Sequence, residues 1–223
     1  MSPTSTRPAS PLSGLARVLA VAVVVVEVIG VVCQFAQTTD PTPPLTYFTV
    51  DCAILAIVAG AAALLKPAHP VAPWLRGTAT TGVIVSGLIY ALVIAPASPT
   101  RTWIQPWDDA LARISTIVLH GVAPPLMLAF YLTAPVLARG ARIAEAGRWL
   151  VWPATYLTVI AAGAGVGVWT IPYPFLRPGE SGWPAVLGAV VGMTIILVMI
   201  SLGLLWLGGR VHRWVGRRST APA

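Results

Sequence analysis

Four side chains that could do chemistry stand within or at the ends of long apolar runs: Glu27, Thr49, Asp51 and His120. An ionisable group at bilayer depth costs about 2.5 to 3.5 kcal/mol even on lenient insertion scales, so each one needs a partner or a role. Glu27 is either a proton relay or base, or a protonated carboxyl that is hydrogen-bonded to a neighbouring helix. Asp51 follows Tyr47 by four residues, and it either reaches the membrane interface or takes part in catalysis.

His120 is the only histidine deep within an apolar run. Pro124 and Pro125 lack N–H groups, so they release the carbonyls of His120 and Gly121, and the helix should kink there. Freed carbonyls beside an imidazole form a polar pocket at membrane depth. Because histidine takes and returns a proton near neutral pH, His120 is either a base or a packing residue whose polar atoms are satisfied.

Thr49 stands near the start of an apolar run, where a threonine ordinarily caps the helix or bonds back to it. The runs that carry Thr49 and His120 have adjacent ends on the same side of the membrane, so a hydroxyl and a base could meet. At about 1.5 Å per residue from Leu45 and from Leu111, their depths differ by about 7 Å. An error of two to four residues at either helix end closes much of this gap.

Six apolar runs must position these side chains. The chain has 223 residues, of which 57% are hydrophobic and 9% are charged, against about 25% charged in soluble domains. Runs of about 18 or more apolar residues are typical of membrane helices, and these are too continuous for the alternation of barrel strands. The sequence therefore predicts an all-α polytopic membrane protein with six transmembrane helices, at Leu15–Phe35, Leu45–Leu65, Arg76–Ala95, Leu111–Thr133, Trp149–Ile171 and Pro184–Gly208.

Lysine and arginine are concentrated in alternate connections. The N-terminus, the second and fourth loops and the C-terminus hold 11 of the 14 cationic residues. By the positive-inside rule, both termini are predicted to be cytoplasmic and the protein to lie in the plasma membrane. Residues 1–14 are expected to form a disordered tail, 15–209 the transmembrane domain, and 210–223 a basic cytoplasmic tail.

The composition argues against several other classes of protein. The net charge of +7 falls in short clusters between uncharged runs, which does not favour nucleic-acid binding. Two cysteines and three scattered histidines form neither a zinc module nor a haem ligand pair, so no metal or cofactor is expected. Whether Cys33 and Cys52 are bridged is left open. Thirteen arginines to one lysine are typical of a GC-rich bacterial genome.

Four short segments occur in a recognisable order on the predicted helix ends: Tyr47-Phe48-Thr49, Leu119-His120 with Pro124, Trp152-Pro153 with Tyr156, and Pro172-Tyr173-Pro174-Phe175-Leu176. Together they resemble an uncharacterised branch of bacterial six-helix membrane proteins. That branch is related to the androgen-induced and androgen-dependent TFPI-regulating proteins. The likeness runs from the first helix to about Gly209.

The resemblance implies a hydrolase for fatty-acid esters of hydroxy fatty acids, with Thr49 as nucleophile and His120 as base. Asp51 and Glu27 are the carboxylates available to orient the imidazole, and the choice between them stays open. An oxyanion site would use a helix-start N–H near Thr49, or the hydroxyl of Tyr90 or Tyr156. Two departures weaken the expectation of activity, since Cys52-Ala53 replaces Ser-Asn and Ala161-Ala162-Gly163 replaces a segment with a common arginine.

Two other functions are open. A small proton-coupled transporter would use Glu27, Asp51 and His120 as a relay, although the sequence shows no inverted repeat. A non-catalytic membrane protein is the third interpretation. Membrane lipids are the expected partners, with a fatty-acid ester as substrate of the hydrolase, and the oligomeric state is undetermined.

Overall fold

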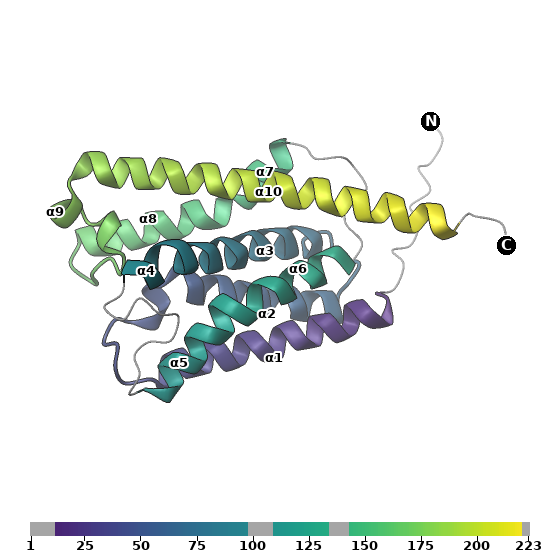
Figure 1. Ribbon diagram of the computed structural model, residues 1–223, viewed down its shortest axis with the longest axis horizontal. Coiled ribbons are helices and arrows are strands. Elements are labelled where there is room, and N and C mark those ends of the chain that lie inside the picture. Colours follow the sequence, from purple (N-terminus) through teal and green to yellow (C-terminus); the bar gives the residue numbers. More distant parts are fainter. Residues whose placement is uncertain (1–11, 98–108, 134–142, 220–223) are drawn as a thin grey trace.

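The computed structural model describes residues 12–97, 109–133 and 143–219, and all regular structure in these ranges is helical. The longer helices run side by side in a bundle (Figure 1). In that view α10 and α8 lie along one side, α1 and α5 along the other, and α2, α3 and α6 between them. The bounds are α1 Gly14–Ala36, α2 Phe48–Leu65, α3 Ala72–Ile89, α5 Ala110–Ile117, α6 Ala123–Thr133, α7 Ile143–Trp149, α8 Val151–Gly165 and α10 Trp183–Ser219.

Shorter elements complete the described chain. Two π turns, η2 (Tyr90–Ile94) and η3 (Val118–Val122), continue α3 and join α5 to α6. The remaining single-turn elements are η1 (Pro44–Thr46), α4 (Ala95–Ala97), η4 (Pro174–Leu176) and α9 (Pro178–Ser181).

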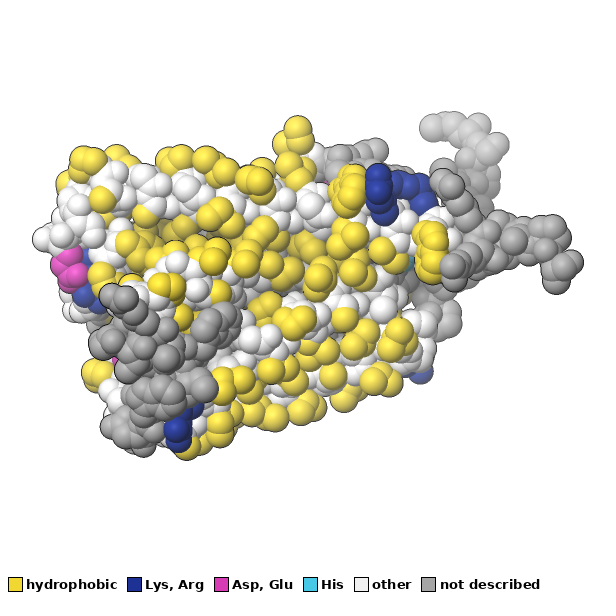
Figure 2. Space-filling model, in the orientation of Figure 1, with side chains coloured by type: hydrophobic (Ala, Val, Ile, Leu, Met, Phe, Trp, Pro, Cys, Tyr) yellow, Lys and Arg dark blue, Asp and Glu magenta, His cyan; other side chains and the backbone are white. Residues whose placement is uncertain are grey.

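Within the described residues, five stretches are long and apolar enough to cross a membrane: Gly14–Ala36, Phe48–Leu65, Ala72–Ala97, Ala110–Thr133 and Trp183–Trp214. Hydrophobic side chains cover the length of the visible face, and the coloured charged side chains lie towards its ends (Figure 2). A water-facing surface of this kind would expose far more apolar area than a soluble monomer tolerates. The all-helical, membrane-embedded architecture agrees with the sequence prediction.

The predicted helix Trp149–Ile171 is interrupted. It is divided between α7 and α8 at Leu150, and α8 ends at Gly165. The end is a glycine turn, because Gly167 has φ of +75° and the Val168 N–H donates to the Gly163 carbonyl at 2.8 Å. A left-handed residue after a helix satisfies its last carbonyls and stops it.

The last helix is longer than predicted. It does not end at Gly208 but continues as α10 to Ser219, so the segment predicted as a basic tail is helical over most of its length. Arginine is a good helix former, and the Arg210 guanidinium lies 4.3 Å from the centre of the Trp206 ring, one turn earlier. Of the disordered tail predicted for residues 1–14, residues 1–11 lie outside the described residues, and Gly14 is already the first residue of α1.

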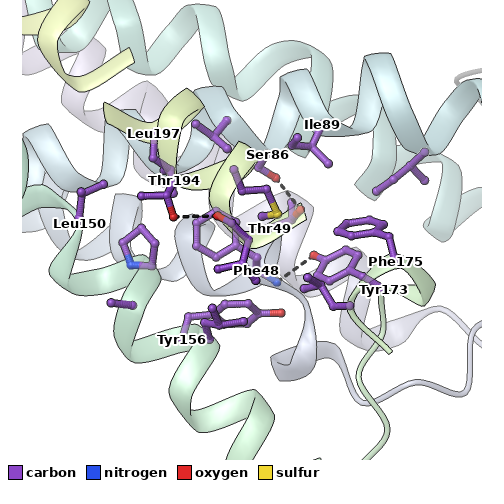
Figure 3. A pocket seen from close by; sticks show the side chains of 18 residues that line it. Phe48, Thr49, Ser86, Ile89, Leu150, Tyr156, Tyr173, Phe175, Thr194 and Leu197 are labelled. Atoms are coloured by element: carbon purple, nitrogen blue, oxygen red, sulfur yellow. Dashed lines mark hydrogen bonds between the residues drawn. The ribbon is translucent and has the colours of Figure 1, made fainter. Parts of the chain in front are cut away.

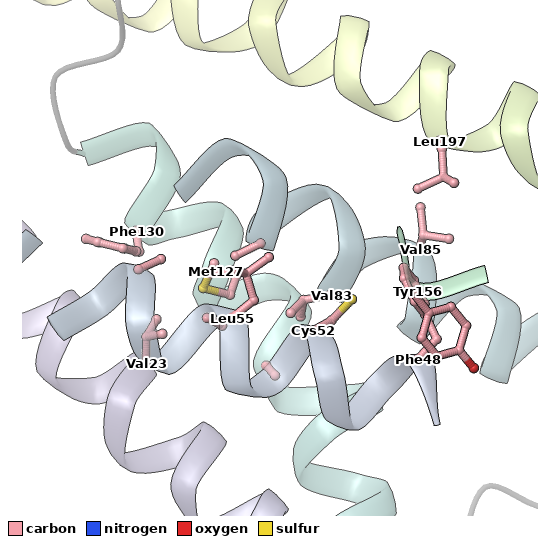
Figure 4. Packing of buried hydrophobic residues seen from close by; sticks show 14 of the residues in the cluster. Val23, Phe48, Cys52, Leu55, Val83, Val85, Met127, Phe130, Tyr156 and Leu197 are labelled. Atoms are coloured by element: carbon pink, nitrogen blue, oxygen red, sulfur yellow. The ribbon is translucent and has the colours of Figure 1, made fainter. Parts of the chain in front are cut away.

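Small residues bring the central helices together. A Cβ on Gly60 of α2 would lie 3.1 Å from the Ala20 carbonyl oxygen of α1. Such small-residue contacts are how membrane helices gain packing energy in the absence of a hydrophobic drive between them. Larger side chains such as Val23, Leu55 and Met127 fill the spaces between helices (Figure 4). Cys33 and Cys52 are both buried and free.

Candidate active site

The first turn of α2 holds Thr49. Tyr47 is the N-cap residue, with extended backbone and no side-chain cap bond. The Phe48 N–H donates to the Tyr173 hydroxyl at 3.1 Å, and the Tyr156 hydroxyl donates to the Thr46 carbonyl at 2.7 Å. Burial raises the pKa of the Tyr173 phenol, which keeps it neutral. Two tyrosines from the distant part of the chain therefore fix the helix start.

Thr49 neither caps α2 nor bonds back to it. Its Oγ1 lies 3.2 Å from His120 Nε2 and 2.5 Å from Ser86 Oγ. The hydroxyl and the imidazole, which the sequence placed about 7 Å apart in depth, are thus within hydrogen-bond distance. The later start of α2, at Phe48, would by itself widen the gap. The two side chains meet because the starts of α2 and α5 do not lie at the same depth, whereas the sequence prediction had assumed that they do.

The hydrogen bonds of His120 determine which nitrogen carries the proton. Nδ1 lies 3.1 Å from the Thr116 carbonyl oxygen, and a carbonyl can only accept. Nδ1 of the neutral imidazole is therefore the donor, and Nε2 has a free lone pair that accepts from the Thr49 hydroxyl. The Tyr90 ring stacks on the imidazole, with centroids 4.1 Å apart and an interplanar angle of 25°.

Ser86 is a site residue that the sequence analysis missed. The single Thr49 hydroxyl hydrogen points to His120, so the bond between the two hydroxyls has Ser86 as donor. The hydrogen bonds then run in one direction, from Ser86 through Thr49 and His120 to the Thr116 carbonyl. Little in the sequence distinguished Ser86 from the other hydroxyl residues of the same helix, which are Thr78, Thr80 and Thr81.

Two π turns bring Tyr90 and His120 face to face. η3 ends two residues before Pro124, where a kink was predicted, and η2 ends two residues before Pro96. A proline leaves a carbonyl of the preceding turn without its donor, and a π turn is one way for the helix to absorb this. The kink prediction is thus realised as a widened turn, whereas the equivalent turn at Tyr90 was not predicted.

Gly87 allows α3 to approach η3 closely. A Cβ at this position would lie 2.7 Å from Cγ of Pro124 and 3.0 Å from the His120 carbonyl oxygen. Real Cβ atoms rarely come so near to backbone. Gly87 therefore sets the distance between Ser86, its neighbour in sequence, and the turn that carries the imidazole.

A cavity of about 260 Å³ adjoins the Thr49 and Ser86 hydroxyls (Figure 3). It lies between α2 and α3 on one side and α8 and α10 on the other, with the Tyr173–Leu176 loop at one end. His120 is absent from its described lining, as are all other charged or titratable nitrogen and carboxyl groups. The hydroxyl of Thr49 thus separates an apolar space from the base.

One backbone donor beside the nucleophile is unused. In the first turn of α2, the Phe48 N–H binds Tyr173, and the N–H groups of Val50 and Asp51 bind the Tyr47 carbonyl. Within the described residues the Thr49 N–H has no hydrogen-bond partner. A free helix-start donor next to the reactive oxygen is what an oxyanion site requires.

Neither candidate carboxylate is hydrogen-bonded to His120 in the described part of the chain. Glu27 is only 1% exposed, and both of its oxygens lack a partner. Asp51 is half-buried and lies about 200° around α2 from Thr49. The group that orients the imidazole is the Thr116 backbone carbonyl. The described residues contain no cluster of three or more histidine, cysteine or acidic side chains that could hold a metal ion.

No family model, no curated protein and no solved structure matches this chain. The relationship to the androgen-induced and androgen-dependent TFPI-regulating proteins therefore stays an expectation from the four segments named above. The local geometry at Thr49 stands independently of it.

Proposed function

We propose that this protein is an integral membrane lipid-ester hydrolase with Thr49 as nucleophile and His120 as general base. The observation that carries the proposal is the 3.2 Å approach of Thr49 Oγ1 to His120 Nε2, on the wall of an apolar cavity. A hydroxyl bonded to the free lone pair of an oriented imidazole is the signature of an activated nucleophile. We further propose that α7 and α8 together form the sixth transmembrane segment. The protein then lies in the plasma membrane with both termini in the cytoplasm.

The chemistry follows from the direction of the hydrogen bonds. Nε2 of His120 takes the Thr49 proton as Oγ1 attacks the ester carbonyl carbon, and the Thr49 N–H donates to the oxyanion that forms. The bond to the alcohol oxygen then breaks, and His120 returns the proton to that oxygen. Water attacks the acyl-threonine with His120 again as base, which releases the acid and regenerates the hydroxyl.

Two features favour a neutral lipid ester as the substrate. The similarity of Tyr47-Phe48-Thr49 and Leu119-His120 to the related branch favours fatty-acid esters of hydroxy fatty acids. An apolar cavity within the membrane suits any neutral lipid ester. Membrane lipids surround the site and are the source of substrate.

A fluorophosphonate probe, with mapping of the labelled peptide, tests this proposal. We expect labelling of Thr49 that is retained in Thr49→Ser and lost in Thr49→Val and His120→Asn, with ester hydrolysis reduced at least about 1,000-fold. Thr194→Val is the matched control, because the Thr194 hydroxyl lines the same cavity but donates to the Val190 carbonyl. Labelling that persists in both the Thr49→Val and His120→Asn proteins rules the mechanism out.

A proton-coupled transporter is the second candidate, and one observation favours it. Both oxygens of the buried Glu27 lack a partner within the described residues, and intramembrane carboxyls of this kind occur in proton relays. Substrate flux into proteoliposomes that is lost in Glu27→Gln, with no Thr49-dependent hydrolysis, selects this function. A folded protein that responds in neither assay is non-catalytic.

A further inference from the structure

The hydroxyl groups of the described cavity wall are hydrogen-bonded to the backbone, except for those of Thr49 and Ser86. The hydroxyls of Tyr156 and Thr194 donate to backbone carbonyls, and that of Tyr173 accepts the Phe48 N–H. Only the Thr49–Ser86 pair lacks such a backbone bond. A carboxylate, phosphate or ammonium group within the cavity would be buried with no opposite charge in the described lining, which is strongly unfavourable.

The volume of the cavity limits the length of chain that fits. A methylene group occupies about the volume of a water molecule in the liquid, about 30 Å³. The cavity of about 260 Å³ therefore holds roughly eight carbons. A single medium-length acyl chain fills it, whereas a longer chain extends beyond its walls.

The lining is open on one side of the bundle. Ala154 of α8 and Thr194 of α10 both line the cavity, yet both are exposed. On α10 the exposed residues near Thr194 are apolar, among them Val191 and Ile195. An opening that is framed by apolar exposed residues at the middle of a membrane helix faces hydrocarbon rather than water.

These three observations point to one mode of binding, which we infer on the basis of the proposed hydrolase function. The acyl chain of the ester enters between α8 and α10, occupies the cavity, and places its carbonyl carbon at Thr49 Oγ1. The site selects uncharged acyl chains, about eight carbons of which fill the cavity, and the rest of a longer chain extends through the opening into the lipid. The alcohol part of the ester, with any charged group, stays outside the cavity.

Hydrolysis of p-nitrophenyl esters from two to sixteen carbons by the full chain in nanodiscs tests the inference. We expect Thr49-dependent kcat/KM to rise about tenfold or more from two carbons to about eight, where the cavity is filled, and to change less than about threefold from there to sixteen. An acyl chain of the same length with a free carboxylate at its far end should be cleaved about 100-fold more slowly. A rate that is the same from two to sixteen carbons, or that still rises about tenfold between eight and sixteen, overturns the inference, as does cleavage of the charged chain at a similar rate.

A pair of matched variants locates the chain. Ala154→Leu adds three carbons to the cavity lining, so the chain length at which the rate levels off should shorten by about three carbons. Ala161→Leu makes the same change on α8, two turns away, at an exposed position outside the cavity lining, and should leave that chain length unchanged. Equal behaviour of the two variants overturns the inference. The absence of any Thr49-dependent cleavage overturns the proposed function itself, whereas Thr49-dependent cleavage without chain selectivity overturns this inference alone.

Discussion

The two halves of the bundle differ in how closely their helices meet. On the side of α1, α2, α3 and η3, a Cβ at Gly30, Gly60, Gly82 or Gly87 would collide with a neighbouring helix. On α10 a Cβ at Gly188, Gly192 or Gly203 would meet nothing within 4 Å. The tight half holds the hydrogen bonds of Thr49, and the open half contributes much of the cavity wall. The helices that position the Thr49 hydroxyl therefore differ from those that form much of the space for a lipid chain.

Gly87→Ala is expected to have the largest effect on this contrast. The new Cβ must push α3 away from Pro124 and the His120 carbonyl, and a displacement of about 1 Å at a catalytic pair costs about 100-fold in rate. Overpacking should also lower the free energy of unfolding by about 1–3 kcal/mol. Ester turnover and thermal unfolding in detergent measure both.

Gly188→Ala is the matched control in the open half. Gly188 is exposed and its Cβ would lie in free space. This substitution should leave turnover unchanged and, through helix propensity, should not lower stability. Equal losses in the two alanine variants would show that the halves do not differ.

Ser86→Ala tests the direction of the hydrogen bonds in the tight half. The Thr49 oxygen loses the hydrogen bond from Ser86 that helps to orient it towards His120. A typical hydrogen bond contributes about 0.5–1.5 kcal/mol of net stabilisation. We expect kcat to fall up to about tenfold with little change in KM. Ser115→Ala, which removes a buried hydroxyl bonded to Gln34, should leave kcat unaffected. A changed KM with an unchanged kcat would assign Ser86 to the cavity wall alone.

The smallest effect is expected from substitution of Asp109, and it is a pH-dependent change in the stability of the fold. It caps α5 and also accepts from the Thr38 N–H at 3.0 Å and the Thr39 hydroxyl at 2.7 Å. These bonds hold the pKa of its carboxyl well below the usual range, with the Thr38 N–H bond as the largest cause. A lowered folded pKa stabilises the fold above the unfolded value of about 3.9. That stabilisation is lost as the pH falls through the folded pKa.

Asp109→Asn should therefore flatten the acid side of the stability profile. Thermal unfolding of the wild type and the variant, followed from pH 7 down to pH 2, measures the difference. The wild type should be the more stable above about pH 4, and the two curves should converge in acid. A constant offset at every pH would mean that the bonds stabilise the fold without involving the charge.

The apolar runs predicted the five long helices of the described residues, because hydrophobicity over about 18 residues is what the membrane requires. The departure from α geometry before Pro124 was also predictable, since it follows from a missing N–H. Pro96 also lacks an N–H, and the π turn at Tyr90 could have been predicted from it in the same way. The length of α10 was missed because a pair of glycines and a run of arginines do not end a helix when no left-handed turn follows.

The hydropathy pattern did not predict which side chains contact one another. Ser86 meets Thr49 because Gly82 and Gly87 let α3 approach α2 and η3, and hydropathy does not encode such approaches. A carboxylate was expected to orient the His120 imidazole, because acidic side chains can be recognised in a sequence. The Thr116 carbonyl that takes this place belongs to the backbone, which every residue shares.

The use of a main-chain oxygen behind the imidazole has an evolutionary consequence. No replacement of a single side chain deletes that oxygen, so the orientation of His120 is inherited together with the winding of its helix. Relatives could exchange every side chain around the ring and still present the same nitrogen to the hydroxyl, provided that the widened turn before Pro124 is kept.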